Sequence, residues 1–328
     1  MDRRAFIGSL ALGILTGPDT TRAELVRKVH RIGIGSPGAT ADMVGPQPRG
    51  PATNALLRGM HELGYRYGEH FMTEPRGADG RPERHRGVAA ELVRLQVDVI
   101  VAGGIMAPAF KHATSTIPIV MAGASDPVGD KLVASLGRPD GNFTGLSLQS
   151  TELTGKRLEL LKELVPGASL VAVFWDRSTQ SGQVAEAAAR ERGWKLLSIE
   201  IREEGDIERA FTTATAARAS AILVGAPGIL VTRARRVAEL AARSRLPAMY
   251  VARSYVEDGG LMSYGADIVE IYRRAASFVD RILKGAKPGD LPVEQPTKFE
   301  LVINVKAAKT IGLTIPPSLL ARADEILR

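Results

Sequence analysis

The chain has 328 residues, long enough for two domains with full cores. Its hydrophobic content of 45% and charged content of 24% are ordinary for a soluble globular protein. The net charge of +7 comes mainly from scattered arginines, and with 5% aromatic residues no basic-aromatic stripe predicts a nucleic-acid partner. The sequence contains no Cys, which excludes disulfides, thiol catalysis and Cys-bound metals.

Residues 1–23 have the layout of a secretory signal peptide. A charged start with Arg3 and Arg4 precedes a short apolar run, and small residues, Thr21 and Ala23, occupy both key positions of a cleavage site. The paired arginines also resemble the twin-arginine export signature, although an ordinary Sec signal with two arginines is an alternative. Both routes predict export to the periplasm.

Two stretches of the chain repeat one plan, at 97–122 and at 219–251. Each has an apolar run, a Gly-rich loop, a helix-length segment and a second apolar run that begins with Ile-Pro or Leu-Pro. A buried parallel strand needs an unbroken apolar run, and its partner is reached through a crossover helix. The repeat therefore predicts two α/β lobes whose strand-end loops face a shared cleft.

Strands and helices are expected to alternate along almost the whole chain, which favours doubly wound parallel sheets. The expected strands are 31–35, 70–74, 97–102, 119–122, 143–146, 170–175, 195–200, 221–224, 248–251, 261–264 and 299–303. The expected helices include 152–164, 267–283, 306–311 and 316–326.

The lobes are expected to be non-contiguous in sequence. Lobe 1 would contain 29–145 and about 263–298, and lobe 2 would contain 146–262 and about 299–328. Gly141–Ser147 and Gly259–Gly265 are short apolar strands between glycines, a type of segment that can absorb a small hinge rotation. Two ordinary edge strands are the alternative.

No cofactor or metal site is expected. Gly33–Gly38 matches G-x-G-x-x-G, but Pro37 and the prolines after it delay the helix that should meet a pyrophosphate. None of the five His residues has metal-ligand spacing, and no nucleophile elbow or phosphate-binding loop is present. Nothing in the sequence favours an enzyme.

Loops after the predicted strands are the expected ligand contacts, because open α/β sheets bind ligands at the carboxyl ends of their strands. Gly103 and Gly104 would let backbone amides approach a ligand. Asp126 would either hold a ligand ammonium or cap the next helix. The candidate contacts are Ser36, Gly103, Gly104, Ile105, Asp126, Ser147, Trp175, Asp176, Gly225, Pro227, Arg253 and Tyr255.

Alternatives stay open for three further residues of this set. Trp175 could cover a ligand or pack in the core. Arg253 and Tyr255 could meet a carboxylate or an aromatic ring, or they could form a solvated pair on the surface.

Several longer motifs resemble one bacterial family, the ABC-transporter substrate-binding proteins related to the tryptophan/tyrosine-binding lipoproteins. They are Thr114–Val120, Asp126–Val128, Leu132–Asn142, Lys156–Gly167, Gly259–Gly265, Arg281–Pro288, Leu291–Asn304 and Pro316–Glu325. The resemblance implies a type I periplasmic-binding-protein fold with three crossing segments and no catalysis. It also implies a small-molecule solute, a membrane permease as partner and, we expect, a monomer.

Two cleft positions depart from the family pattern. Ile105-Met106 follows the glycine pair where a hydroxyl residue is common, and Trp175-Asp-Arg177 replaces a common Asn-Pro. An aromatic amino acid is therefore one candidate solute among similar amines and carboxylates. The rival classes are a LacI-like regulator, which needs a helix-turn-helix before the lobes, and an α/β transferase or epimerase, which needs paired catalytic groups in the cleft.

Overall fold

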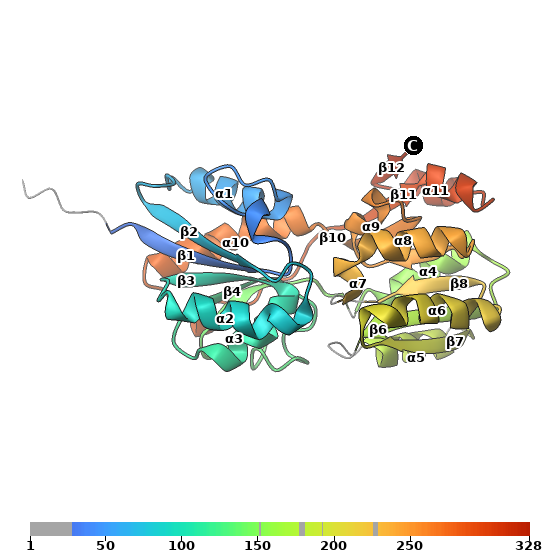
Figure 1. Ribbon diagram of the computed structural model, residues 1–328, viewed down its shortest axis with the longest axis horizontal. Coiled ribbons are helices and arrows are strands. Elements are labelled where there is room, and N and C mark those ends of the chain that lie inside the picture. The colour runs from blue at the N-terminus through green and yellow to red at the C-terminus, as the bar shows by residue number, and fades with distance from the viewer. Residues whose placement is uncertain (1–27, 151, 177–180, 192, 226–228) are drawn as a thin grey trace, which may run out of the picture.

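The protein, represented here by a computed structural model, consists of two α/β lobes that lie side by side (Figure 1). The structure describes residues 28–150, 152–176, 181–191, 193–225 and 229–328. The predicted signal peptide at 1–23 lies outside the described residues. Within the described ranges, no helix combines the length and the apolar character needed to cross a bilayer.

The first lobe is built on a five-stranded parallel sheet in the order β2-β1-β3-β4-β5. Its strands are β1 (His30–Ser36), β2 (Phe71–Gly77), β3 (Val99–Gly103), β4 (Ile119–Ala124) and β5 (Phe143–Ser147). Helices α1 (Pro51–Glu62) and α10 (Ile268–Leu283) pack together on one face, and α2 (His85–Arg94) and α3 (Ala107–Ala113) cover the other. Every residue of β3, β4 and β5 is buried, because both faces of these strands are covered.

The second lobe has a seven-stranded sheet in the order β12-β11-β10-β9-β8-β6-β7. Its strands are β6 (Leu170–Asp176), β7 (Lys195–Ile201), β8 (Ala221–Val224), β9 (Ala248–Tyr250), β10 (Met262–Ala266), β11 (Phe299–Asn304) and β12 (Glu325–Leu327). One face carries α4 (Thr154–Leu164), α5 (Ser181–Glu191), α11 (Val305–Thr310) and α12 (Pro317–Arg322). The other carries α6 (Glu204–Ala216), α7 (Ile229–Thr232), α8 (Ala234–Arg243) and α9 (Arg253–Glu257).

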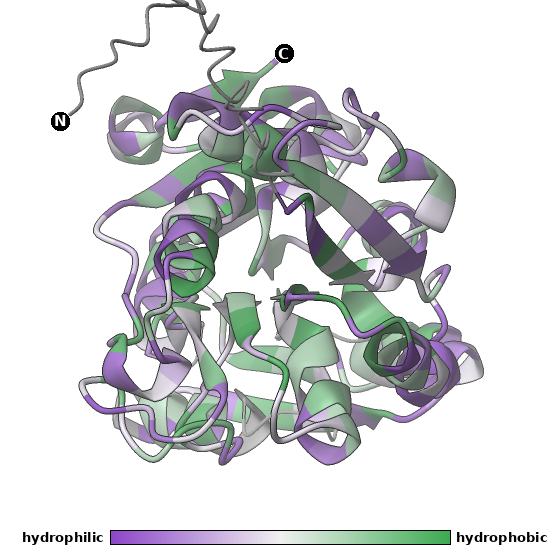
Figure 2. Ribbon diagram, turned by 90° about the vertical axis from the view of Figure 1, so that its left-hand side faces the viewer, coloured by the Kyte–Doolittle hydropathy of each residue, from purple (hydrophilic) through white to green (hydrophobic). Residues whose placement is uncertain are grey.

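Hydrophobic periodicity explains these layers. In α10, apolar side chains such as Ile271, Ala275, Phe278 and Val279 recur at helical spacing and are buried against the first sheet. Figure 2 shows the same pattern in space, with hydrophobic strands inside and helices that carry hydrophilic residues around them. The predicted architecture of two doubly wound lobes is confirmed, apart from one antiparallel strand.

That exception, β11, follows from how the chain passes between the lobes. The chain crosses three times: after β5 from residue 148 on, at Ala266–Asp267 between β10 and α10, and at 295–298 before β11. Strand β10 runs parallel to β9 and carries the chain out of the second lobe, whereas β11 brings it back. The returning strand must therefore run antiparallel to β10, which is the pairing observed.

Two boundaries differ from the sequence prediction. The second crossing was expected near residue 263, but Met262–Ala266 pairs with Phe299–Ile303 in the second sheet, so the chain leaves that lobe only after Ala266. The helix expected over 316–326 ends at Arg322. The backbone N–H of Asp324 donates to Leu301 O at 2.9 Å, and β12 then pairs in parallel with β11.

Candidate functional site between the lobes

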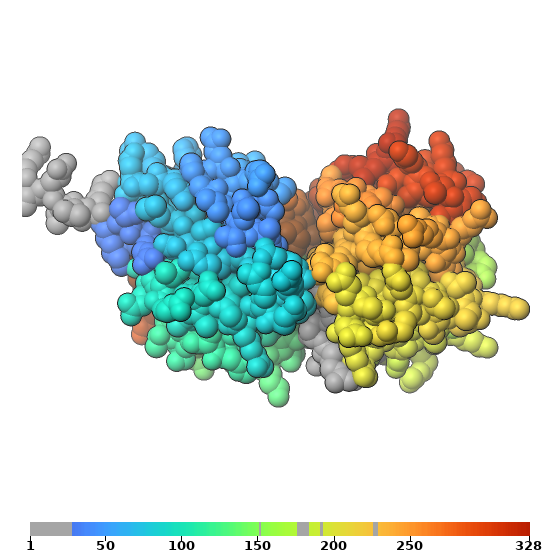
Figure 3. Space-filling model, viewed as in Figure 1, coloured from blue at the N-terminus to red at the C-terminus, as the bar shows by residue number. Residues whose placement is uncertain are grey.

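The carboxyl ends of both parallel sheets point toward the junction between the lobes. Strand β5 runs parallel to β4 and leads into the second lobe, and β10 runs parallel to β9 and leads into the first. Figure 3 shows the lobes as separate bodies that meet along a seam. The lobes also meet at the loop after β2, where a Cβ atom built on Gly80 would lie 3.0 Å from Nη1 of Arg233. The candidate site is the space bounded by these two carboxyl edges.

In the first lobe, a glycine pair brings three elements together at the carboxyl edge. A Cβ on Gly104 would lie only 1.7 Å from the carbonyl oxygen of Gly123, so the backbones of β3 and β4 pack here with no room for a side chain. A Cβ on Gly103 would lie 2.9 Å from the hydroxyl of Tyr272 and 3.1 Å from Cδ of Pro37. Gly103, whose backbone amide was predicted to contact a ligand, therefore also leaves space for the hydroxyl of Tyr272.

Tyr272 was not predicted from the sequence, because it lies on α10, far along the chain from the strand-end loops. Its side chain is 6% exposed, and burial raises the pKa of its hydroxyl to about 12. The hydroxyl is therefore protonated at neutral pH and can donate a hydrogen bond. None of the described residues forms a hydrogen bond with this hydroxyl, so its donor is unused within the described part of the fold. In a sequence, a tyrosine at an apolar position of a helix looks the same as an ordinary core residue.

The hydroxyls of two predicted residues are used within their own turns. Ser36, at the end of β1, accepts from the N–H of Gly38 at 3.1 Å. Ser147, at the end of β5, is 2% exposed and accepts from the N–H of Gln149 at 3.0 Å. Ile105 is half-buried in a short 3-10 turn after the glycine pair. All three lie at the carboxyl edge of the first sheet.

Asp126 follows β4 and caps the turn that comes next. Its Oδ1 accepts from the N–H of Gly129 at 2.8 Å. The sequence left two roles open for this carboxylate, and this bond corresponds to the capping role. The negative charge of Asp126 also acts on Asp130, where burial and then this charge raise the pKa to about 6.

In the second lobe, a buried arginine lies beneath the carboxyl edge. Arg157 is 2% exposed and lines a cavity of about 10 Å³, which has room for about one water, together with Ser150, Thr154, Gly225 and Val251. Burial lowers the pKa of its guanidinium to about 9, which leaves it cationic at neutral pH. A sequence signal existed for this residue: Arg157 lies four residues after Leu153 and three before Leu160, on the apolar side of α4.

The other predicted contacts of the second lobe have different partners. Trp175 donates from Nε1 to Ser198 Oγ at 2.9 Å, so its indole lies against the edge strand β7. Gly225 is buried and lines the cavity beside Arg157. Of Asp176 only the backbone is described, at the end of β6, and Pro227 lies outside the described residues.

Tyr255 and Arg253 were predicted to face the cleft, and the structure gives them other roles. Tyr255 is fully buried and stacks on Tyr250, with ring centroids 4.7 Å apart, in the core beneath α8 and α9. The guanidinium of Arg253 bonds Glu257 at 2.7 Å and Glu325 at 2.8 Å. Both placements result from the short helix α9, which directs Tyr255 into the lobe and Arg253 toward β12. The sequence analysis did not predict this helix.

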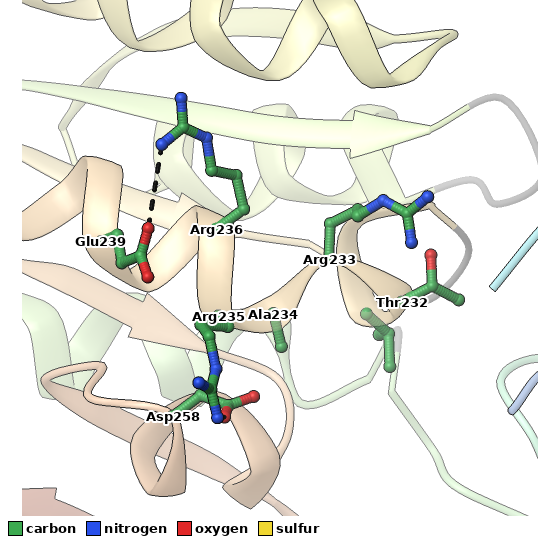
Figure 4. A pocket seen from close by; sticks show the side chains of 8 residues that line it. Thr232, Arg233, Ala234, Arg235, Arg236, Glu239 and Asp258 are labelled. Atoms are coloured by element: carbon green, nitrogen blue, oxygen red, sulfur yellow. Dashed lines mark hydrogen bonds and ion pairs between the residues drawn. The ribbon is translucent and has the colours of Figure 1, made fainter. Parts of the chain in front are cut away.

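A cavity of about 290 Å³ lies near the interlobe contact at Gly80, around the start of α8 (Figure 4). Three arginines line it, and each has an acidic partner. Arg233 bonds Glu204 at 2.9 Å, and Arg235 lies 3.4 Å from Asp258. Arg236 pairs with Glu239 at 3.8 Å, as the figure shows, and also with Glu208. Because these charges are already neutralised, we do not take this cavity as the solute site.

The described residues contain no cluster of three His, Cys, Asp or Glu side chains that could hold a metal ion. At the junction, the first lobe contributes a glycine pair and a tyrosine hydroxyl, and the second lobe has the buried cation Arg157 beneath its edge. A hydroxyl at such an edge can orient a small molecule through a hydrogen bond. The fold and site together define a two-lobed α/β protein of the periplasmic-binding class.

Comparison with known proteins identifies the family. The chain belongs to the ABC transporter substrate binding protein family, whose sequence model matches residues 46–327. A tyrosine-binding protein from Clostridioides difficile is 24% identical over 267 residues, which cover 80% of this chain and 76% of that protein. The expected family and the type I periplasmic fold are confirmed.

Two solved structures are similar over nearly the whole chain. A conserved domain protein from Vibrio cholerae has a TM-score of 0.83 at 29% identity, covering 91% of this chain and 100% of its own. A Streptococcus pneumonia ABC domain in complex with L-Trp has a TM-score of 0.82 at 25% identity, covering 92% of this chain and 100% of its own. The match to the L-Trp complex spans both lobes, so the two chains share a similar lobe arrangement.

Proposed function

We propose that this protein captures a small solute between its lobes and delivers it to the permease of an ABC importer. The observation that carries the proposal is the pair of sheets whose carboxyl edges point toward each other, joined by three crossing segments. Binding sites of open α/β sheets lie at such edges. Membership of the substrate-binding family supports the same function.

Binding would proceed by closure of the lobes. A solute first contacts one edge, the second lobe rotates onto it, and water leaves the space between them. The solute can shift this equilibrium only by binding the closed form better than the open form. The crossing segments are short relative to the lobes, so rotation about them would leave both hydrophobic cores intact.

The solute class that we favour is an aromatic amino acid or a similar molecule with an amine and a carboxylate. One relative is named a tyrosine-binding protein, and a similar structure contains L-Trp. On this chain, the amides at Gly103 and Gly104 and the hydroxyl of Tyr272 supply hydrogen-bond donors. Asp126 lies at this edge, and although its Oδ1 accepts the N–H of Gly129, its negative charge would attract an ammonium group.

The partner would be a membrane permease that recognises the closed shape. We place the protein in the periplasm, exported with residues 1–23 as its signal, by the twin-arginine or the Sec route. It would work as a monomer and would carry out no catalysis. The proposed task needs only reversible capture, which hydrogen-bond donors and a closing cleft provide.

The decisive experiment identifies what the purified protein carries. Denaturing the protein and analysing the released small molecules by mass spectrometry should detect one solute at near-stoichiometric amount. Calorimetric titration of the solute-free protein with that compound, L-tryptophan and L-tyrosine should then give saturable binding. No released molecule and no binding across an amino-acid panel would count against the proposal. Salt-sensitive DNA binding in a gel-shift assay would favour the regulator class instead.

A further inference from the structure

Arg157 connects the first crossing segment to β10, the strand that leads into the second crossing. Its Nε donates to the carbonyl oxygen of Tyr264 at 2.7 Å, and its Nη1 donates to the carbonyl oxygen of Ser150 at 2.6 Å. Ser150 belongs to the first crossing segment, and Tyr264 lies in β10, two residues before the crossing at Ala266. A single side chain on α4 thus bonds the backbone at both places.

Burying the charge of Arg157 inside the lobe is energetically unfavourable. Arg157 is 2% exposed, and the charge of Glu152 acts on it, but no described carboxylate forms an ion pair with it within 4 Å. Burial of an unpaired charge is strongly unfavourable unless hydrogen bonds satisfy it. Here the partners are two backbone carbonyls and, at 3.4 Å, the hydroxyl of Ser150. Leu158 and Leu161 on the same helix are fully buried. An apolar residue at position 157 would therefore suit this environment and would avoid the cost of burying a charge.

The third crossing segment is connected to the first in another way. The backbone N–H of Ser147 donates to Glu294 O at 2.9 Å, and the N–H of Glu294 donates to Gly145 O at 2.9 Å. Backbone pairing therefore joins β5, which leads into the first crossing, to Glu294, just before the third. The side chain of Arg157 joins the first crossing to β10, which leads into the second. Together these bonds connect the backbone at or beside all three crossings.

We propose that Arg157 is a positioning residue of the hinge, which sets the resting angle between the lobes by fixing the spacing of Ser150 and Tyr264. This role rests on the proposed function, because an interlobe angle matters only if the lobes close. Arg157 would then affect solute affinity through the closure equilibrium, without requiring contact with the solute. Its backbone bonds would restrict the motions available to the solute-free protein.

The test measures the interlobe distance in the absence of solute. The sequence has no Cys, so Arg86→Cys on α2 and Glu239→Cys on α8, both exposed, give two unique sites for spin labels. Double electron–electron resonance should show one main distance in the otherwise unchanged protein. Arg157→Met should broaden this distribution or shift its maximum by several Å, because both carbonyls lose their donor.

Two control variants on the same helix separate hinge position from stability. Leu158→Ala removes a fully buried side chain next to Arg157 and should lower the melting temperature without moving the distance distribution. Lys162→Met removes another cation of α4, one that donates to Ala168 O inside the second lobe, and should also leave the distance unchanged. Arg157→Gln keeps an amide donor on a shorter side chain and should give an intermediate distribution.

The outcomes are distinct. A folded Arg157→Met protein with an unchanged, narrow distribution overturns the proposal. If that variant does not fold, Arg157→Gln and Arg157→Lys are measured in the same way, and unchanged distributions in both overturn it. Because no solute is added, failure to bind any solute would refute the proposed function while the distance measurement still decides the role of Arg157.

Discussion

The two lobes share a plan but build their carboxyl edges differently. At the edge of the first lobe, Gly104 and Gly123 let two backbones approach, and no side chain fits between them. At the edge of the second lobe, a long cationic side chain, Arg157, fills the space beneath the strands. One edge is therefore set by backbone packing and the other by a hydrogen-bonded charge. The edge of the first lobe should tolerate almost no added side-chain volume, and the edge of the second lobe should depend on the hydrogen-bond donors of Arg157.

The largest expected effect comes from removing an aromatic core residue in either lobe. Phe110 in the first and Phe174 in the second are fully buried, so each change to Ala should destabilise the protein by about 3–5 kcal/mol. Both Trp residues of the chain, Trp175 and Trp194, lie in the second lobe, so fluorescence reports that lobe and circular dichroism reports both.

This difference in probes tests whether the lobes unfold together. If they do, Phe110→Ala should shift the urea transitions seen by fluorescence and by circular dichroism equally. A shift in circular dichroism alone would show that the first lobe unfolds independently, and the comparison would then concern two separate folding units.

The next effect concerns the glycine edge. Gly104→Ala would place a Cβ 1.7 Å from Gly123 O, and such overpacking should cost about 3 kcal/mol. Gly87, on α2, is the matched control, because its Cβ would meet nothing within 4 Å. Gly87→Ala should be neutral or stabilise by about 0.5–1 kcal/mol, since Ala is the better helix former. Urea denaturation measures both, and equal stabilities would show that the glycine edge is not tightly packed.

A smaller effect should appear in the pH dependence of the first lobe. Burial and the charge of Asp126 raise the pKa of Asp130 to about 6. A carboxyl whose pKa is raised on folding favours the protonated state, so its ionisation destabilises the protein as pH rises through about 6. Because the group is partly exposed, the expected penalty is about 1 kcal/mol.

Replacing this carboxylate removes the penalty. Asp130→Asn should stabilise the protein at pH 7.5 and have little effect at pH 4, where Asp130 is already mostly protonated. Urea denaturation at the two pH values provides the measurement. Equal stabilisation at both would mean that the ionisation of Asp130 is not the cause.

The smallest effect compares two tyrosine hydroxyls. Tyr272→Phe removes the hydroxyl at the first edge and should weaken solute binding by about 1 kcal/mol, the worth of one hydrogen bond. Tyr250→Phe in the second lobe removes a buried hydroxyl that has no partner in the described structure, so stability should be unchanged or slightly higher. Calorimetry with the solute identified by mass spectrometry measures the first, and denaturation measures the second.

The sequence predicted the lobes well, because buried parallel strands need continuous apolar runs such as Ile119–Ala122, which periodicity reveals. It was less successful at the site. Tyr255 looks like a strand-end residue, but the short helix α9 turns its ring into the core. Such a helix of five residues leaves too little periodicity to detect.

The residues that the sequence analysis missed were missed for a related reason. Tyr272 reaches the first edge from α10, and only the tertiary packing of that helix places its hydroxyl beside Gly103. Arg157 was detectable in principle as a charge on an apolar helix face. Its partners, however, are backbone carbonyls, and backbone atoms carry no residue-specific signal.

The position of α10 in the chain has a consequence for biosynthesis. This helix covers one face of the first sheet, yet it follows almost the entire second lobe in the sequence. After β1 through β5 have left the ribosome, α1 alone would cover this face, and the part formed by Val101 and Val120 would still be exposed. That surface stays uncovered until residue 283 has emerged, so the first part to be translated is among the last to mature.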